Sequence, residues 1–167
     1  MTAAPTQPLR DEHKELLPHI ESLRVAADAV GVAPTAVVRQ RVDDAYDFLA
    51  HHLLPHAQAE EQALYPVVGK VIGASEATRT MSRDHVEVGR LVEELGALRE
   101  RLASGTMREP EAQALRRVLY GLYTLVSVHF AKEEEVYLPL LDARLGADEA
   151  REMFAAMEAA AAEAKRR

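Results

Sequence analysis

The chain of 167 residues has no cysteine and no tryptophan, and only 5% of its residues are aromatic. The lack of cysteine excludes disulfides, thiolate metal ligands and thiol catalysis. No run of about 18 apolar residues occurs, so we expect no membrane-spanning helix. The first residues, MTAAPTQPLRDEH, include no apolar segment typical of a signal peptide. We therefore expect a cytoplasmic protein.

Basic residues are scarce relative to acidic ones. The chain carries 20 lysines and arginines against 27 aspartates and glutamates, which gives a net charge of -7. Binding to nucleic acid needs a concentrated basic face. The one basic cluster, at 165–167, is better explained as favourable charge at the end of a helix. We therefore expect neither nucleic acid nor a membrane among the partners.

Strand-like alternation is scarce as well, while alanine, leucine, glutamate and arginine are abundant, so helices are expected. Glycine, proline and serine divide the chain into expected helices at about 8–30, 34–69, 75–103, 110–146 and 148–165. The first four predict an all-α, up-down-up-down four-helix bundle over about 9–145. With the additional C-terminal helix they would form a single domain. Pro18 and Pro55 lie inside helical segments, where we expect kinks.

Two stretches repeat one pattern: HAQAEEQALYP at 56–66 and HFAKEEEVYLP at 129–139 share a histidine, two glutamates and a proline at equal offsets. Residues four apart in an α-helix share a face, so His56 projects with Glu60, and His129 with Glu133. A single pair of this kind would usually be a solvated surface pair. Two matched copies instead indicate that both pairs belong to one functional site.

Two single histidines extend the repeat, because His13 precedes His56 by nearly the same distance as His85 precedes His129. Two such helical hairpins, stacked about a pseudo-twofold axis, would bring four histidines and two glutamates together in the core. The glutamates lie on apolar stripes, and no lysine or arginine is placed to neutralise them, so two metal ions are predicted. The alternative is a metal-free core in which histidines bond to carboxylates.

At these residues the sequence resembles the hemerythrin-like family, also called the HHE cation-binding domain, over about 9–145. The resemblance implies a non-haem di-iron centre with an oxo or hydroxo bridge, four terminal histidine ligands and two bridging glutamates. The implied metal ligands are His13, His56, Glu60, His85, His129 and Glu133. Nitrogen and oxygen ligands also suit manganese or zinc, which we favour less than iron.

Two departures from the family's oxygen carriers matter. The carriers have a further histidine one turn after the third-helix histidine, where this chain has Gly89. They also place the last carboxylate five residues after its histidine, so Glu134 is an alternative to Glu133. The repeat favours Glu133, which leaves Glu61 and Glu134 beside the ligands or at the surface.

The missing histidine would leave two coordination positions open instead of one, unless another side chain fills the gap. The side chains that could fill it are His52, Tyr46, Tyr65, Tyr120, Tyr123 and Tyr137. His19 and His51 fall off the ligand faces, and we assign them no role. Two open positions favour reaction with a small oxidant over reversible O2 binding.

These patterns predict a di-iron protein that reacts with hydrogen peroxide or O2, with catalase- or peroxidase-like activity as one form. A non-catalytic protein that binds or senses O2 or iron is the alternative, and a metal-free helical interaction module is a third. The C-terminal helix has an apolar stripe that includes Met153, Phe154 and Met157. We expect this stripe to pack onto the bundle, with a dimer contact as the alternative, so the chain would be a monomer or a dimer.

Overall fold

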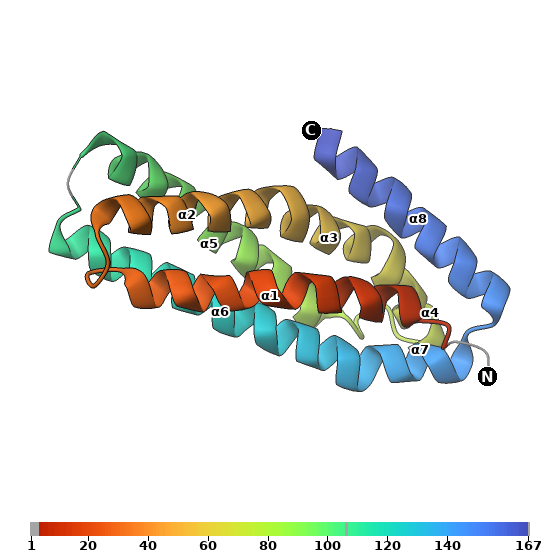
Figure 1. Cartoon of the computed structure of the whole chain (residues 1–167). Helices are drawn as coiled ribbons and strands as arrows, with labels where there is room; N and C mark the ends of the chain where they lie inside the picture. Colours follow the sequence, from red (N-terminus) through yellow and green to blue (C-terminus); the bar gives the residue numbers. More distant parts are fainter. Residues whose placement is uncertain (1–3, 106, 167) are drawn as a thin grey trace.

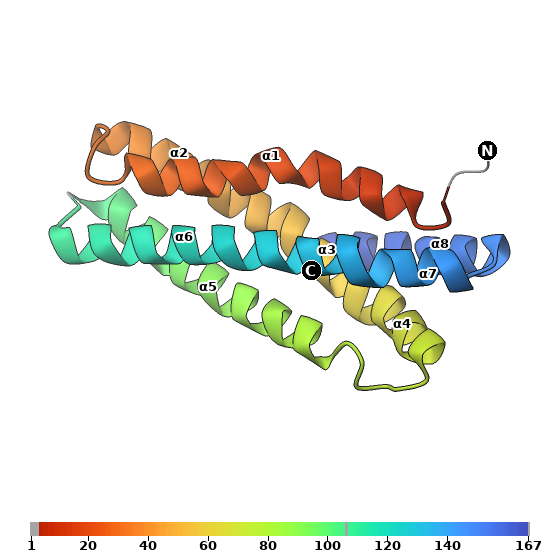
Figure 2. The same cartoon turned by 90° about the horizontal axis from the view of Figure 1, so that it is seen from below.

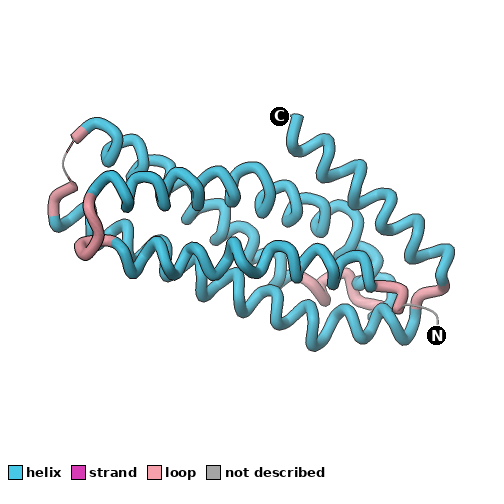
Figure 3. The backbone as a smooth tube through the Cα atoms, in the orientation of Figure 1, coloured by secondary structure: helices cyan, strands magenta, loops and turns pink. Residues whose placement is uncertain are grey.

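Four long helical rods run alternately up and down, and a fifth helix follows them (Figures 1 and 2). The computed structural model describes residues 4–105 and 107–166, which are helical apart from short connections (Figure 3). No strand occurs in these ranges, so the predicted all-α bundle is confirmed. None of the helices in the same ranges is both long enough and apolar enough to cross a membrane.

The rods are α1 (Gln7–Ala29); α2 (Thr35–Phe48), η1 (Leu49–Leu53), α3 (Leu54–Ala59), η2 (Glu60–Leu64) and α4 (Tyr65–Ile72) in direct succession; α5 (Arg79–Ser104); and α6 (Glu109–Lys132), η3 (Glu133–Tyr137) and α7 (Leu138–Arg144) in direct succession. The fifth helix is α8 (Ala147–Arg166). The expected start of the third rod at residue 75 was wrong, because 75–78 form turns and α5 begins only at Arg79.

Three wide turns of π-helix interrupt the second and fourth rods. Each of them ends two residues before a proline, namely Pro55, Pro66 and Pro139. In η2 the amide of Tyr65 donates to the carbonyl of Glu60, and in η3 the amide of Leu138 donates to that of Glu133. A proline ring crowds the carbonyl four residues earlier and offers no N–H, so a wider turn ahead of it lets the rod continue.

Ahead of Pro55 the helix widens into the π turn η1, and the kinks expected at Pro18 and Pro55 stay predictions. Pro18 behaves differently, because α1 continues through it without such a turn. The hydroxyl of Ser22 donates to the Pro18 carbonyl at 2.9 Å. A proline in these rods thus does not end the helix.

The apolar core has two parts, and the buried histidines and glutamates of the repeated pattern lie between them. On α1, Leu16 belongs to the larger cluster and Leu9 to the smaller one, with the buried His13 in between. The larger cluster fills the space among α1, α2, α5 and α6 with fully buried side chains such as Leu23 and Leu122. The motif therefore sits in the core with apolar packing on both sides, which limits the access of water.

Helix α8 completes the smaller cluster. It packs against α3 and η2, beside the second rod (Figure 1). Met153, Met157 and Ala160 are buried there. The apolar stripe of the C-terminal helix thus lies on the bundle, as predicted.

Replacement of Leu122 by alanine tests the larger cluster. The side chain of Leu122 is fully buried, so its loss removes apolar contacts and leaves a cavity, and we expect the free energy of unfolding to fall by about 2–5 kcal/mol. Val128→Ala on the same helix is the control, because Val128 is 52% exposed. Urea denaturation measures both variants, and an equal effect would contradict the assignment of Leu122 to the core.

Candidate metal centre

Glu60 lies between histidines from the three other rods and its own. Its Oε1 atom is 2.9 Å from Nε2 of His56, and its Oε2 atom is 3.1 Å from Nε2 of His85. The same Oε2 atom lies 3.7 Å from Nε2 of His129. The two oxygens of one carboxylate thus face two separate groups of imidazoles.

Glu133 repeats this arrangement. Its Oε2 atom is 3.3 Å from Nε2 of His13, and its Oε1 atom is 3.3 Å from Nε2 of His129. His13 comes from α1 and His129 from α6, the same rod as Glu133. All four rods therefore contribute to one cluster.

The side chains form two groups that could each hold a metal ion. Within each group the potential ligand atoms lie within 4.8 Å of one another. The first group is His13, His56, Glu60 and Glu133, and the second is Glu60, His85 and His129. Glu60 belongs to both groups, as a bridging carboxylate would. The six residues predicted from the sequence are thus brought together, and their role as metal ligands stays a prediction.

The burial of these groups shows that the residues fit a cation. Glu60 and Glu133 have no exposed surface. Nε2 of His13 and of His56, both oxygens of Glu60 and Oε2 of Glu133 are buried without a hydrogen-bond partner. Each such atom costs about 1–3 kcal/mol when it is left unpaired. The atoms converge without hydrogen-bond geometry, and nitrogen and oxygen donors of this kind suit iron, manganese or zinc.

Each histidine turns its other ring nitrogen, Nδ1, toward a second carboxylate. The pairs are His13 with Glu134 (2.7 Å), His56 with Glu12 (3.0 Å), His85 with Glu61 (2.7 Å) and His129 with Asp84 (3.0 Å). An Nδ1–H that donates to a carboxylate leaves the Nε2 lone pair free for a metal and fixes the ring orientation. All four imidazoles are therefore held in the orientation that a metal ion needs.

These partners separate the two neighbouring glutamates of the second motif. Glu133 faces the cluster, whereas Glu134 accepts from Nδ1 of His13 and is 33% exposed on its side chain. The sequence interpretation did not identify Glu12 and Asp84. Each of them immediately precedes a single histidine, in DEH and RDH, and this shared acidic neighbour was the signal that could have found them.

Without metal, the glutamates are neutralised by protons on the histidines. Burial alone would lower the pKa of His13, but the nearby Glu133 and Glu60 carboxylates outweigh it and raise the pKa to about 9. Burial would also lower the pKa of His129, but the same two carboxylates outweigh it and raise this pKa to about 10. Burial alone would raise the pKa of Glu60, yet His56 and its neighbours hold it well below its usual range. The carboxylates of the cluster therefore stabilise positive charge on the groups that face them.

Tyr65 adds a hydroxyl to the second group. It donates to Oε1 of Glu133 at 3.0 Å and lies 3.3 Å from Nε2 of His129 and 3.4 Å from Nε2 of His85. In an α-helix the fifth residue after Glu60 would point away from the ligand face. The π turn closes after five residues and brings Tyr65 back to that face.

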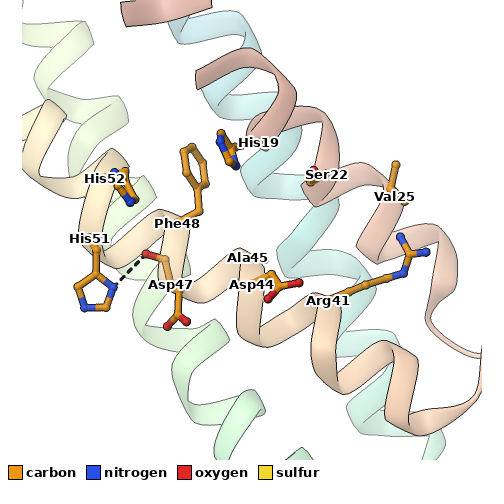
Figure 4. A pocket seen from close by; sticks show the side chains of 10 residues that line it. All are labelled: His19, Ser22, Val25, Arg41, Asp44, Ala45, Asp47, Phe48, His51 and His52. Atoms are coloured by element: carbon orange, nitrogen blue, oxygen red, sulfur yellow. Dashed lines mark hydrogen bonds between the residues drawn. The ribbon is translucent and has the colours of Figure 1, made fainter. Parts of the chain in front are cut away.

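The other side chains that could have filled the position opened at Gly89 lie elsewhere, and these are His52, Tyr46, Tyr120, Tyr123 and Tyr137. His52 lines a groove between α1 and α2 together with His19 and His51 (Figure 4). The His19 and His52 rings stack on Phe48, at centroid distances of 4.9 and 6.3 Å. Within the described ranges, none of these three histidines belongs to a group that could hold a metal ion.

An apolar cavity adjoins the metal-facing atoms. Its volume is about 10 Å³, which is room for about one water-sized molecule. The apolar side chains around it are Leu53, Ala57, Val88, Val126 and Phe130. The Phe130 ring also stacks on His13 at a centroid distance of 4.3 Å. These side chains keep water away from one side of the cluster.

Four antiparallel helices around a buried cluster of histidines and carboxylates define an all-α bundle with an internal metal site. A family model, the hemerythrin HHE cation binding domain, matches residues 4–141. The chain therefore belongs to this family, and together the family and the cluster mark it as a metal-binding protein. No curated protein and no solved structure matched the chain. The match includes all six predicted ligands and ends before α8.

Metal binding should release protons, because His13 and His129 are protonated at neutral pH in the metal-free protein. The stabilisation from these protonated histidines is complete below a pH of about 6.5 and is lost as the pH rises through 9 to 10. Because a metal ion must displace these protons, metal affinity should rise with pH over the same range. Titration of the metal-free protein with Zn²⁺ in weak buffer, followed with a pH indicator, should show release of at least the two protons from these residues. A His19→Ala variant should behave like the wild type, and uptake without proton release would contradict the prediction.

Proposed function

We propose that this chain is a di-iron protein that reacts with small oxidants, preferably hydrogen peroxide and otherwise O2. The proposed cofactor is a pair of iron ions joined by an oxo or hydroxo bridge. The single observation that carries this proposal is the set of buried atoms of His13, His56, Glu60 and Glu133 that converge from three rods without hydrogen-bond partners. The proposed ligands are His13, His56, Glu60, His85, His129 and Glu133. Tyr65 is proposed as an additional oxygen ligand at the second ion position, the one that Glu60, His85 and His129 face.

When bound, iron supplies the exchange of electrons with the oxidant. The chain's own residues hold, orient and shield it. Glu60 and Glu133 each direct one oxygen to the first ion position and the other oxygen to the second. They would therefore fix the distance between the two ions. The four carboxylates on Nδ1 make the histidines better donors and fix their rings. Tyr65 keeps a hydroxyl beside the second position.

The second position is where we expect the oxidant to react. Gly89 offers no imidazole there, and a β-carbon added at Gly89 would meet nothing within 4 Å. The nearest additional donor is the hydroxyl of Tyr65, an oxygen in place of a nitrogen. An oxygen donor favours the ferric state more than imidazole does, which suits reaction with peroxide more than reversible O2 binding.

A non-catalytic protein that binds or senses O2 or iron is the second candidate. The apolar cavity beside Phe130 favours it, because an apolar space suits an apolar molecule such as O2. Reversible changes in absorbance on addition and removal of O2, without turnover of peroxide, would support this candidate over the first.

Iron loading tests the proposed function directly. We expect two irons per chain, charge-transfer bands in the near ultraviolet, and O2 evolution from hydrogen peroxide. His85→Ala removes a donor from the second position and should abolish most of the turnover and lower the iron content toward one per chain. His19→Ala, in the groove of Figure 4, is the matched control. Turnover no greater than that of free iron, or unchanged in His85→Ala, would reject the enzymatic proposal.

Tyr65→Phe tests the role of the hydroxyl. Burial and the nearby Glu60 and Glu133 raise the pKa of Tyr65 in the metal-free protein, and a cation at the second position would reverse this effect. We expect the iron-loaded wild type to show a visible phenolate-to-iron band that Tyr65→Phe lacks, and the variant's iron affinity to fall about 10- to 100-fold. Tyr137→Phe is the control, because its hydroxyl donates to the carbonyl of Ala77. Identical spectra for all three proteins would exclude Tyr65 as a ligand.

A further inference from the structure

The cluster is least buried at His85. The side chain of His85 is 11% exposed, against 2% for His13, 3% for His56 and 4% for His129. The carboxylate on Nδ1 of His85, Glu61, is 37% exposed on its side chain. Among the four imidazoles, that of His85 is therefore the one that solvent reaches most, although Glu12, the carboxylate on His56, is more exposed than Glu61, at 49%.

A cleft of about 600 Å³ opens at this place, between α4, the connection at 73–78 and the start of α5. Two polar side chains of its lining, Glu61 and Ser82, are linked to His85. Ser82 donates from its hydroxyl to Oε2 of Glu61 at 2.9 Å, while Oε1 of Glu61 faces His85. The other polar side chains in the lining are Lys70, Ser75 and Thr78.

Two glycines fix the shape of the cleft. Gly73 has a φ of 81°, in the left-handed region, where it ends α4. The amides of Gly73 and Ala74 both donate to the Gly69 carbonyl, at 2.9 and 3.0 Å. A β-carbon at Gly69 would lie only 3.3 Å from the Ala74 carbonyl oxygen. The connection therefore folds tightly against α4, and the cleft is a built feature of the fold.

Tyr65 separates the cleft from the second metal position. Its side chain lines the cleft, and its ring stacks on His85 at a centroid distance of 5.4 Å and an interplanar angle of 10°. Its hydroxyl contacts Glu133 and His129 on the inner side. A molecule in the cleft is thus one side chain away from the proposed reaction position.

The other approach to the cluster is narrower. A cavity of about 170 Å³ lies between α1, α3 and α8 and reaches His56. Phe154 and Met157 of α8 line it, and His56 is almost completely covered. Its smaller volume and the near-complete cover of His56 make it the poorer route.

We propose that the cleft beside Tyr65 and Ser82 is the entrance through which small hydrogen-bonding oxidants of the hydrogen peroxide class reach the second metal position. This inference rests on the proposed function. The serine and threonine hydroxyls and the Glu61 carboxylate bind such molecules by hydrogen bonds, which O2 does not form. The cleft thus selects polar oxidants, and the apolar cavity beside Phe130 takes no part in their entry.

Blocking the cleft tests the route. Ser75→Trp and, independently, Ala74→Trp place a bulky ring at its mouth. The matched control is Ser22→Trp, in the separate groove between α1 and α2 (Figure 4). Stopped-flow absorbance of the iron-loaded proteins gives the second-order rates of reaction with hydrogen peroxide and of binding of azide. We expect both blocking variants to react about tenfold more slowly or worse, with unchanged iron content and circular dichroism, and the control to match the wild type.

The outcomes separate this inference from the proposed function. Wild-type rates in both blocking variants would overturn the route, even with an intact iron spectrum. An equal slowing in Ser22→Trp would overturn it as well, because the effect would then be unrelated to the cleft. If the wild type binds azide but turns over no peroxide, the proposed function fails, while the azide rates of the variants still decide the route.

Discussion

The structure depends on the neutralisation of two carboxylates that have no exposed surface. Glu60 and Glu133 lie at the centre of the bundle, where an uncompensated charge costs several kcal/mol. In the described residues the groups that face their oxygens are imidazoles and the phenol of Tyr65. Imidazoles compensate a carboxylate only by carrying a proton or by sharing a cation with it. An antiparallel bundle of four rods can bring one histidine from each rod to such a centre. The fold therefore supplies the ring of imidazoles that the two carboxylates need.

The neighbouring glutamates in each motif join the two halves of the chain. The second glutamate of each doublet supports a histidine of the other half: Glu61 holds His85, and Glu134 holds His13. The acid before each single histidine, such as Glu12, supports the motif histidine of its own half. Neither hairpin can therefore orient its own imidazoles completely. This mutual dependence explains physically why the doublet, and not only the histidine and the first glutamate, occurs twice.

The predictability of the site from the sequence ends where the α-helical period ends. His56 and Glu60 were predicted to share a face because the chain between them is α-helical, and the π turn begins only at Glu60. Beyond this residue the period of 3.6 no longer applies, so nothing in the spacing could place Tyr65 inside the cluster. Glu12 lies on α1 and its partner on α3, and such a contact between rods follows from their packing and not from local spacing. The long rods and the fifth helix were predictable because their apolar faces repeat over many turns.

The two halves differ most clearly at one position. Tyr65, five residues after Glu60, corresponds to Leu138, five residues after Glu133. Both side chains are buried in the apolar cluster that α8 completes. Tyr65 in addition carries a hydroxyl beside His85 and His129, and its side chain lines a cleft. The two halves therefore place an aliphatic side chain at one of these positions and a side chain that can exchange hydrogen bonds at the other. A β-carbon at Gly89 would have free space, so steric crowding does not explain the glycine there. The different donor that Tyr65 supplies, beside the most exposed of the four imidazoles, is the physical basis on which we propose that the oxidant reacts at the second position.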